Sequence, residues 1–197
     1  MPNASLKSRV LDSVNVVVSQ FQENPYKFLY ERDIQCALFS ALRRGISETV
    51  SVPRTGQGNY TLDLIYSEYG NKIDLVCLDH DAITKLGREN LPMYKSHDTY
   101  IYDLPILVAI ELKYVTMGYL KGFNILEEDY KKISALKRVK NSLALGFLQS
   151  DREAADFYAD MARQSSATNI SKIDCLNMVY AVSPTKIMMA KVPAGTS

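Results

Sequence analysis

Apolar and polar residues recur along this chain with two periods, one typical of helices and one typical of strands. Apolar side chains recur every three or four residues from 5 to 22, which predicts an amphipathic first helix. A second helix is expected from 25 to 44, because Asn24 and Pro25 form a helix-start signal and Gly45 a helix-end signal.

Two more helices and a strand are expected in the second half of the chain. Helical spacing predicts one helix over 151–164 and a longer one over 126–148, whose inward-facing residues would be Ile133, Leu136, Val139, Leu143 and Phe147. A last long strand is expected over 174–182. The tail from 184 to 197 would hold at most a short edge strand.

A hairpin is predicted in the first half of the chain. Residues 50–58 are rich in turn formers, whereas 60–69 alternate well enough for a strand. Turn residues at 68–71 then lead into a second strand at 72–79. Asp74 interrupts the apolar run of that second strand, and an aspartate in the middle of a strand needs a physical reason.

The most buried strand is expected at 105–114, after a polar and aromatic insert over 80–104. Side chains alternate along a strand, so Glu111 and Lys113 point to the same side. Opposite charges at the end of a core strand are costly unless they are paired, metal-bound or catalytic. This strand is therefore the first place to look for a functional site.

Composition narrows the class of protein. With 197 residues, 47% hydrophobic and 23% charged, the chain fits one globular domain spanning 1–197. No apolar run approaches the ~20 residues that cross a bilayer, so we expect no membrane partner and an intracellular, cytoplasmic protein. A net charge of +1 gives no overall attraction for nucleic acid, so a polyanion would need a local basic patch.

Several other classes of chemistry have no support in the sequence. The three cysteines, Cys36, Cys77 and Cys175, lack paired spacing and are expected to be reduced packing residues. The two histidines match no metal-ligand or triad spacing, and a glycine-rich phosphate loop is absent from the sequence. Nucleotide hydrolysis and serine or cysteine hydrolase chemistry are therefore not indicated.

Taken in order, the elements and their charges resemble the PD-(D/E)XK nuclease superfamily. The residues that carry the resemblance are Glu31 in the first core helix, Asp74 in the hairpin, and Glu111-Leu112-Lys113 in the next strand. It covers residues 25–182 and implies a restriction-endonuclease-like α/β fold with an αβββαβ core and a central mixed sheet flanked by helices. The N-terminal helix and the insert before the Glu-x-Lys strand are additions to that core.

The resemblance also implies roles for these residues. Phosphodiester hydrolysis needs a divalent ion, and Mg²⁺ prefers oxygen ligands while keeping several waters. Asp74, Glu111 and the Leu112 carbonyl would hold Mg²⁺, for which Mn²⁺ would substitute. Lys113 would orient or activate the attacking water and stabilise the developing charge. Glu31 would reach the same site, either to hold a water or to help with a second ion.

Two assignments stay open at this point. Asp63 is a rival for the acid, although Asp74 is preferred because its strand is expected beside the Glu-x-Lys strand. Each charged residue taken singly also has a structural explanation, such as an ion pair between Glu111 and Lys113.

The sequence thus predicts a Mg²⁺-dependent nuclease with nucleic acid as its partner, DNA being the expected substrate. Lys132 and Arg54 are candidates for contacts with the substrate backbone. The residues do not distinguish DNA from RNA or endonuclease from exonuclease. The alternative is a catalytically silent protein of the same fold that binds nucleic acid or another protein, and a homodimer through the first helix is compatible with either.

Overall fold

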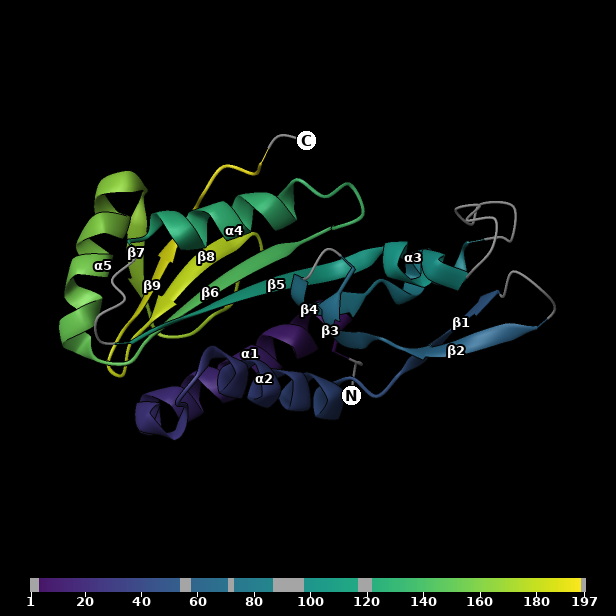
Figure 1. Ribbon diagram of the computed structural model, residues 1–197, viewed down its shortest axis with the longest axis horizontal. Helices are drawn as coiled ribbons and strands as arrows, with labels where there is room; N and C mark the ends of the chain where they lie inside the picture. Colours follow the sequence, from purple (N-terminus) through teal and green to yellow (C-terminus); the bar gives the residue numbers. More distant parts are fainter. Residues whose placement is uncertain (1–3, 54–57, 71–72, 87–97, 117–121, 196–197) are drawn as a thin grey trace.

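The computed structural model describes residues 4–53, 58–70, 73–86, 98–116 and 122–195. Within them lies a seven-stranded mixed sheet with helices on both faces, as Figure 1 shows. The protein is therefore of the mixed α/β class, in agreement with the class expected from the sequence.

The elements have the following bounds. The helices are α1 (Leu6–Glu23), α2 (Glu31–Gly45), α3 (His80–Thr84), α4 (Asn124–Ser134) and α5 (Asp151–Gln164), with 3₁₀ turns at Pro25–Lys27 and Asp98–Asp103. The strands are β1 (Thr49–Pro53), β2 (Asn59–Asp63), β3 (Ile65–Tyr69), β4 (Ile73–Leu78), β5 (Ile106–Val115), β6 (Ser142–Leu148), β7 (Ala167–Ile170), β8 (Met178–Val182) and β9 (Ile187–Ala190).

The main sheet has the strand order β3-β4-β5-β6-β8-β9-β7. β5 runs parallel to β6, and β6 runs parallel to β8, whereas all other neighbours are antiparallel. The β4–β5 ladder ends at the pair Leu75 and Ile110, although β5 continues to Val115. Among the strands that the structure describes, none pairs with the last part of β5 on the β4 side.

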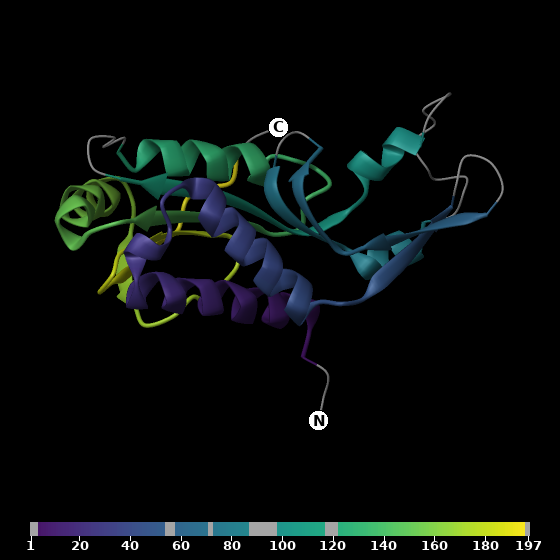
Figure 2. The ribbon, with the colours of Figure 1, turned by 60° about the horizontal axis from the view of Figure 1, so that its bottom comes forward.

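Two helix layers cover the sheet. Helices α1 and α2 lie against one face, and α4 and α5 lie against the other (Figures 1 and 2). Residues of one face of β5, such as Ile110 and Leu112, pack in the core under α1 and α2, whereas Val115 of the other face belongs to the cluster under α4 and α5. Glu111 and Lys113 share the α4 side of the strand with Val115.

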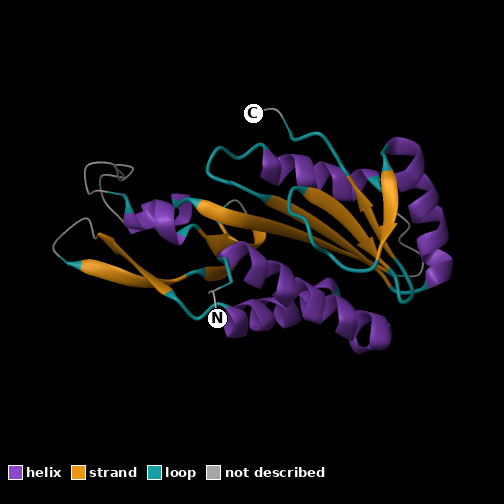
Figure 3. Ribbon diagram, turned by 180° about the vertical axis from the view of Figure 1, so that it is seen from behind, coloured by secondary structure: helices purple, strands orange, loops and turns teal. Residues whose placement is uncertain are grey.

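β1 and β2 form a separate two-stranded sheet that projects from one end of the molecule, with α3 beside β1 (Figures 1 and 3). The sequence predicted a turn-rich segment at 50–58 and one strand over 60–69. The first prediction was wrong for 50–53, which lie in β1, while 54–57 fall outside the described residues. The second was wrong because the strand is interrupted at Leu64 between β2 and β3, which belong to different sheets.

The helix predicted over 126–148 was correct only as far as Ser134. α4 ends at Ser134, and residues 142–148 form β6, which is buried along its whole length. A strand buried on both faces is apolar at every position, so its apolar residues also include a subset with helical spacing. The strand that follows the α4 crossover is consequently β6 and not the segment 174–182.

Smaller corrections concern element ends. The second helix begins at Glu31 because Pro25 opens only a 3₁₀ turn, and the Asp33 carboxylate caps α2 by accepting the N–H groups of Leu29 and Tyr30. The strand expected over 174–182 begins only at Met178.

The C-terminal part of the sheet also differs from expectation. β9 lies inside the sheet, while β7, which the sequence did not reveal, forms its edge. Cys77 is buried as expected, but Cys36 and Cys175 are exposed. Among the described residues, no helix has the length and apolar character needed to span a bilayer.

Candidate active site

Asp74 and Glu111 come together because their strands are neighbours. The antiparallel ladder pairs Leu75 with Ile110, and the same register carried one residue further sets Asp74 opposite Glu111. Glu111 is 3% exposed. Asp74 is half-buried and accepts a hydrogen bond of 2.7 Å at Oδ2 from the Leu112 backbone N–H. Two carboxylates therefore lie side by side where β4 stops pairing with β5.

Glu31 reaches the same edge from α2. It is the first residue of the helix, and its Oε2 accepts a 3.0 Å hydrogen bond from the Tyr114 N–H. The N–H and C=O of one strand residue point to the same edge, so the Leu112 carbonyl lies on the edge that Asp74 and Glu31 occupy. The two carboxylates take over the role that a pairing strand would have for β5.

Helix α4 adds two charges above the sheet. Lys113 Nζ lies 3.0 Å from Asp129 Oδ2, and Lys132 Nζ lies 3.4 Å from Glu111 Oε1. Asp129 and Lys132 are three residues apart and so share one helix face. β6 leaves room for these side chains, because its residues beside Glu111 and Lys113 are Ala144 and Gly146.

The cluster is short of positive charge. Four carboxylates (Glu31, Asp74, Glu111 and Asp129) face two ammonium groups (Lys113 and Lys132). Burial, together with the neighbouring Asp74 charge and a hydrogen bond shared with that carboxyl, raises the pKa of Glu111 to about 8. Burial also raises the pKa of Glu31, although Lys113 and the Tyr114 N–H act against it. An added cation would relieve this repulsion.

Lys113 is held in its charged form. Burial acts to lower its pKa, but the hydrogen bond to Asp129 and the charge of Glu31 outweigh that effect and raise it. The ammonium is therefore a fixed positive charge about one strand pleat from Glu111, on the same face of β5.

The oxygen donors of this cluster suit a hard cation, although they are not arranged as a complete metal-binding site. Asp74 and Glu111 offer carboxylate oxygens and Leu112 a carbonyl, which are ligands that Mg²⁺ accepts together with waters. Within the described ranges, no group of three or more His, Cys, Asp or Glu side chains has metal-binding geometry. The Glu111 carboxylate would have to give up its contact with Lys132 before Asp74 and Glu111 could both bind the ion.

The remaining candidates from the sequence differ in where they lie. Asp63, the rival acid, is in β2 of the separate sheet and forms a 2.5 Å ion pair with Arg43, so it does not join Glu111. Lys132 does lie at the site, where it contacts Glu111. Arg54 falls outside the described residues.

Two members of the site were missed by sequence reasoning. Asp129 had no signal of its own, since its position depends on how α4 lies over β5. Gln35 donates hydrogen bonds of 3.1 Å to the Asp74 carbonyl and 3.0 Å to Glu68 Oε1. Its position one helical turn after Glu31 was the available sign that it faces the same strands.

Comparisons with family models, with curated proteins and with solved structures gave no match.

Proposed function

We propose that this protein is a metal-dependent nuclease of the PD-(D/E)XK type that hydrolyses phosphodiester bonds, with DNA as the expected substrate. The observation that carries the proposal is the joint placement of Asp74, Glu111 and Lys113, with two carboxylates on adjacent strands and the lysine on the same face of β5. The order α2-β3-β4-β5-α4-β6 also supports a restriction-endonuclease-like core.

In this proposal Asp74, Glu111 and the Leu112 carbonyl hold Mg²⁺ or Mn²⁺. The ion, when bound, neutralises phosphate charge and lowers the pKa of a water. Lys113 places its ammonium beside the phosphate and stabilises the negative charge that grows there as the water oxygen attacks phosphorus and the ester oxygen leaves. Asp129 is a positioning residue that keeps Lys113 charged and in place. Glu31 orients a water at the open edge of β5.

Lys132 would move from Glu111 to the substrate. Once an ion holds the Glu111 carboxylate, the Lys132 ammonium, whose side chain is 47% exposed, is free to bind a phosphate of the nucleic-acid backbone. This assigns to Lys132 the substrate contact that the sequence suggested.

Purified protein incubated with single- and double-stranded DNA and Mg²⁺ or Mn²⁺ tests the proposal. We expect cleavage by the wild type and a loss of at least about a hundredfold in Asp74→Ala and Lys113→Ala, the size typical of lost acid–base or electrostatic groups. Asp63→Ala is the matched control and should keep its activity, since Asp63 lies outside the cluster. An inactive wild type, or full activity in both site variants, would falsify the proposal.

A catalytically silent scaffold is the second candidate. It is favoured by the ion pairs Lys113–Asp129 and Lys132–Glu111, which partly satisfy the site without a metal. Calorimetric titration with Mn²⁺ separates the two, because a scaffold has no reason to bind the ion at Asp74 and Glu111. Binding that disappears in Asp74→Asn supports the nuclease, and no binding in the wild type supports the scaffold.

A further inference from the structure

Three large apolar side chains are exposed within five consecutive residues between α1 and α2. Tyr26 is 67% exposed, Leu29 63% and Tyr30 70%. They belong to residues 25–30, which begin with the 3₁₀ turn and end where α2 starts, and which we call the tyrosine segment. Exposed apolar residues scattered singly are ordinary on a protein surface, whereas a group of them indicates a binding surface.

The tyrosine segment is held in place by a buried residue and by hydrogen bonds. Phe28 is buried, and its carbonyl accepts a 2.6 Å hydrogen bond from the Tyr114 hydroxyl. Asp33 accepts the N–H groups of Leu29 and Tyr30 at 2.8 and 3.0 Å. The backbone that carries the exposed rings is therefore fixed to β5 and to the first turn of α2, which lowers the entropy cost of binding a ligand there.

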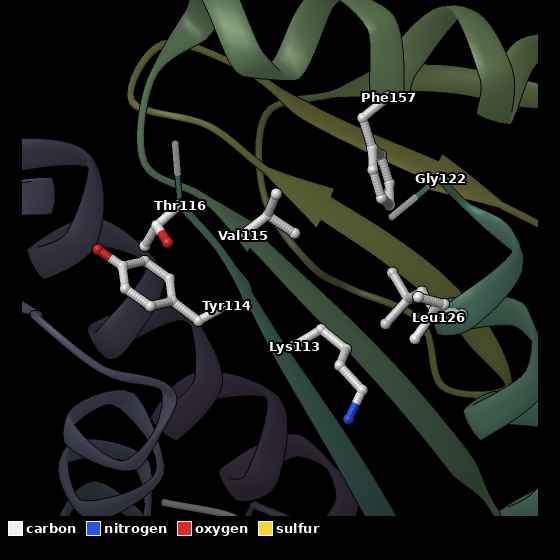
Figure 4. A pocket seen from close by; sticks show the side chains of 8 residues that line it. Lys113, Tyr114, Val115, Thr116, Gly122, Leu126 and Phe157 are labelled. Carbon is white, nitrogen blue, oxygen red and sulfur yellow. The ribbon is translucent and has the colours of Figure 1, made fainter. Parts of the chain in front are cut away.

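The segment lies beside the candidate active site. Tyr30 directly precedes Glu31, whose carboxylate accepts the Tyr114 N–H. Figure 4 shows the side chains of Lys113 and Tyr114 on opposite sides of β5, and the Tyr114 ring lies on the side of α1 and of the tyrosine segment. A nucleic-acid strand that leaves the site past Glu31 therefore meets Tyr30 next.

The charges around the two exposed rings suit a polyanion. Lys27 and Arg32 are exposed and alternate with the tyrosines along the chain. Of the acids over 23–33, Asp33 is engaged by backbone N–H groups, Glu31 is turned to β5, and Glu23 lies beyond the segment at the end of α1. Aromatic rings that stack on bases, beside cations that attract phosphates, are what proteins use to bind single strands.

The size of the surface favours a nucleic-acid strand over a second protein. A stable protein interface buries about 800 Å² on each partner and involves about 20–30 residues, far more than this segment offers. A single strand needs one ring per base, and an unpaired base has a face free for stacking, whereas bases inside a duplex are covered by their neighbours. The Cα atoms of Tyr26 and Tyr30 are at most about 14 Å apart, which is about four nucleotide steps.

We infer that the tyrosine segment binds unpaired nucleotides of the substrate next to the bond that is cut. The enzyme then prefers a single strand, or a duplex with a single-stranded end, over a blunt duplex. The inference rests on the proposed nuclease function, from which it takes nucleic acid as the ligand, and it adds the substrate class. The rings of Tyr26 and Tyr30 stack on bases, while Lys27 and Arg32 bind the adjoining phosphates.

Tyr26→Ala and Tyr30→Ala test the segment, because both side chains are exposed and their removal leaves the core intact. Tyr30→Phe keeps the ring. Tyr102→Ala is the matched control, since Tyr102 is 55% exposed and precedes the opposite end of β5. Affinity is measured for a short oligothymidylate and for a blunt duplex, with Ca²⁺ in place of Mg²⁺. Mn²⁺ affinity is measured by calorimetry and the oligomeric state by sedimentation.

The wild type should bind the single strand more tightly than the duplex. Each of Tyr26→Ala and Tyr30→Ala should weaken single-strand binding by about tenfold, the effect expected from losing one base–aromatic contact. Tyr30→Phe and Tyr102→Ala should bind it as the wild type does. All four variants should keep the melting temperature and the Mn²⁺ affinity of the wild type.

A tryptophan probe reports stacking directly. The chain contains no tryptophan, so Tyr30→Trp gives it a single indole within the segment and keeps an aromatic face there. The emission of this indole should fall when oligothymidylate is added and should stay unchanged with the blunt duplex. Tyr102→Trp should respond to neither.

The outcomes separate this inference from the proposed function. Single-strand affinity unchanged in both alanine variants, with Mn²⁺ binding intact, overturns the segment and leaves the nuclease proposal standing. Alanine variants that change the oligomeric state and not the oligonucleotide affinity overturn it in favour of a protein partner. Single-strand binding that needs the tyrosines, in a protein that binds no Mn²⁺, supports the segment and overturns the nuclease. A wild type that binds neither Mn²⁺ nor oligonucleotide overturns both.

Discussion

At the scale of single residues, Glu111 combines deep burial with a raised pKa. Its carboxyl has a pKa of about 8 in the folded protein, against 4.5 for an unperturbed glutamate, because of burial and the adjacent Asp74. The folded state therefore binds a proton more tightly than the unfolded state. The stability from this proton is fully present below about pH 4.5 and is lost as the pH rises through about 8.

Glu111→Gln should remove that pH dependence. The amide cannot ionise, so in the presence of a chelator the variant should melt higher than the wild type at pH 9 and about equally at pH 4. A gain on the order of 2 kcal/mol corresponds to about 4–8 °C in a chain of this size. Thermal melts across the pH range measure it, with the exposed Glu128→Gln on α4 as control. Parallel curves for wild type and variant would contradict the assignment.

Asp129 governs the charge state of Lys113. Replacing it with asparagine removes the anion that raises the lysine pKa, so Lys113 should lose its proton at a lower pH. We expect Asp129→Asn to cut DNA about tenfold more slowly at neutral pH and to shift the alkaline limit of activity downward. The pH–rate profile is the measurement. A uniform loss at every pH would mean that Asp129 only supports the fold.

At the scale of elements, the start of α2 matters because Glu31 is its first residue. Asp33 caps this end through the N–H groups of Leu29 and Tyr30. Asp33→Ala should cost about 1 kcal/mol of stability and loosen Glu31, which lowers Mn²⁺ affinity without removing a ligand. Chemical denaturation and calorimetry report the two effects. Asp12→Ala, an exposed change within α1, should produce neither.

Some elements could be predicted from the sequence and others could not. The α1 helix and the β5 strand carry unmistakable local patterns, and the charges at the end of β5 marked the site before any partner was known. The chain from Ser134 to Ser142 shows why other elements failed. Its turn contains no glycine or proline, so nothing local separated α4 from β6.

Contacts between residues of different elements were harder to predict than the elements themselves. Asp74 was preferred over Asp63 because its strand was expected beside the Glu-x-Lys strand, and β4 does pair with β5. The contacts of Asp129 and Gln35 depend on how a helix lies over a strand, which no local pattern encodes. Tertiary packing decides such contacts, so they cannot be predicted from the pattern of one element alone.

At the scale of the whole molecule, α1 belongs to the core and supports the site from behind. Phe21 is fully buried. The centroid of its ring lies 5.0 Å from the ring centroid of Phe147 in β6, 6.0 Å from that of Phe28 and 6.4 Å from that of Tyr114. The Tyr114 hydroxyl in turn donates a 2.6 Å hydrogen bond to the Phe28 carbonyl. One ring thus joins the first helix, the entry to α2 and β5.

Phe21→Ala should therefore destabilise the whole fold. The loss of a buried phenylalanine costs about 3–5 kcal/mol, which lowers the melting temperature by about 6–20 °C. Val16→Ala on the same helix should change it little, because Val16 is 47% exposed. Differential scanning calorimetry checks both. An unaffected melting temperature in Phe21→Ala would show that α1 is an appendage and not part of the core.

The edge of β5 beyond its last described pair with β4 bears on how this site would change over evolutionary time. Asp74 and Glu31 accept hydrogen bonds from backbone N–H groups of β5, so each acid has a structural role that does not depend on hydrolysis. Under the proposed nuclease function, a descendant without that activity would still be under pressure to retain both. Lys113 has no such backbone duty among its described contacts, so its loss would be the earlier sign of an inactive descendant.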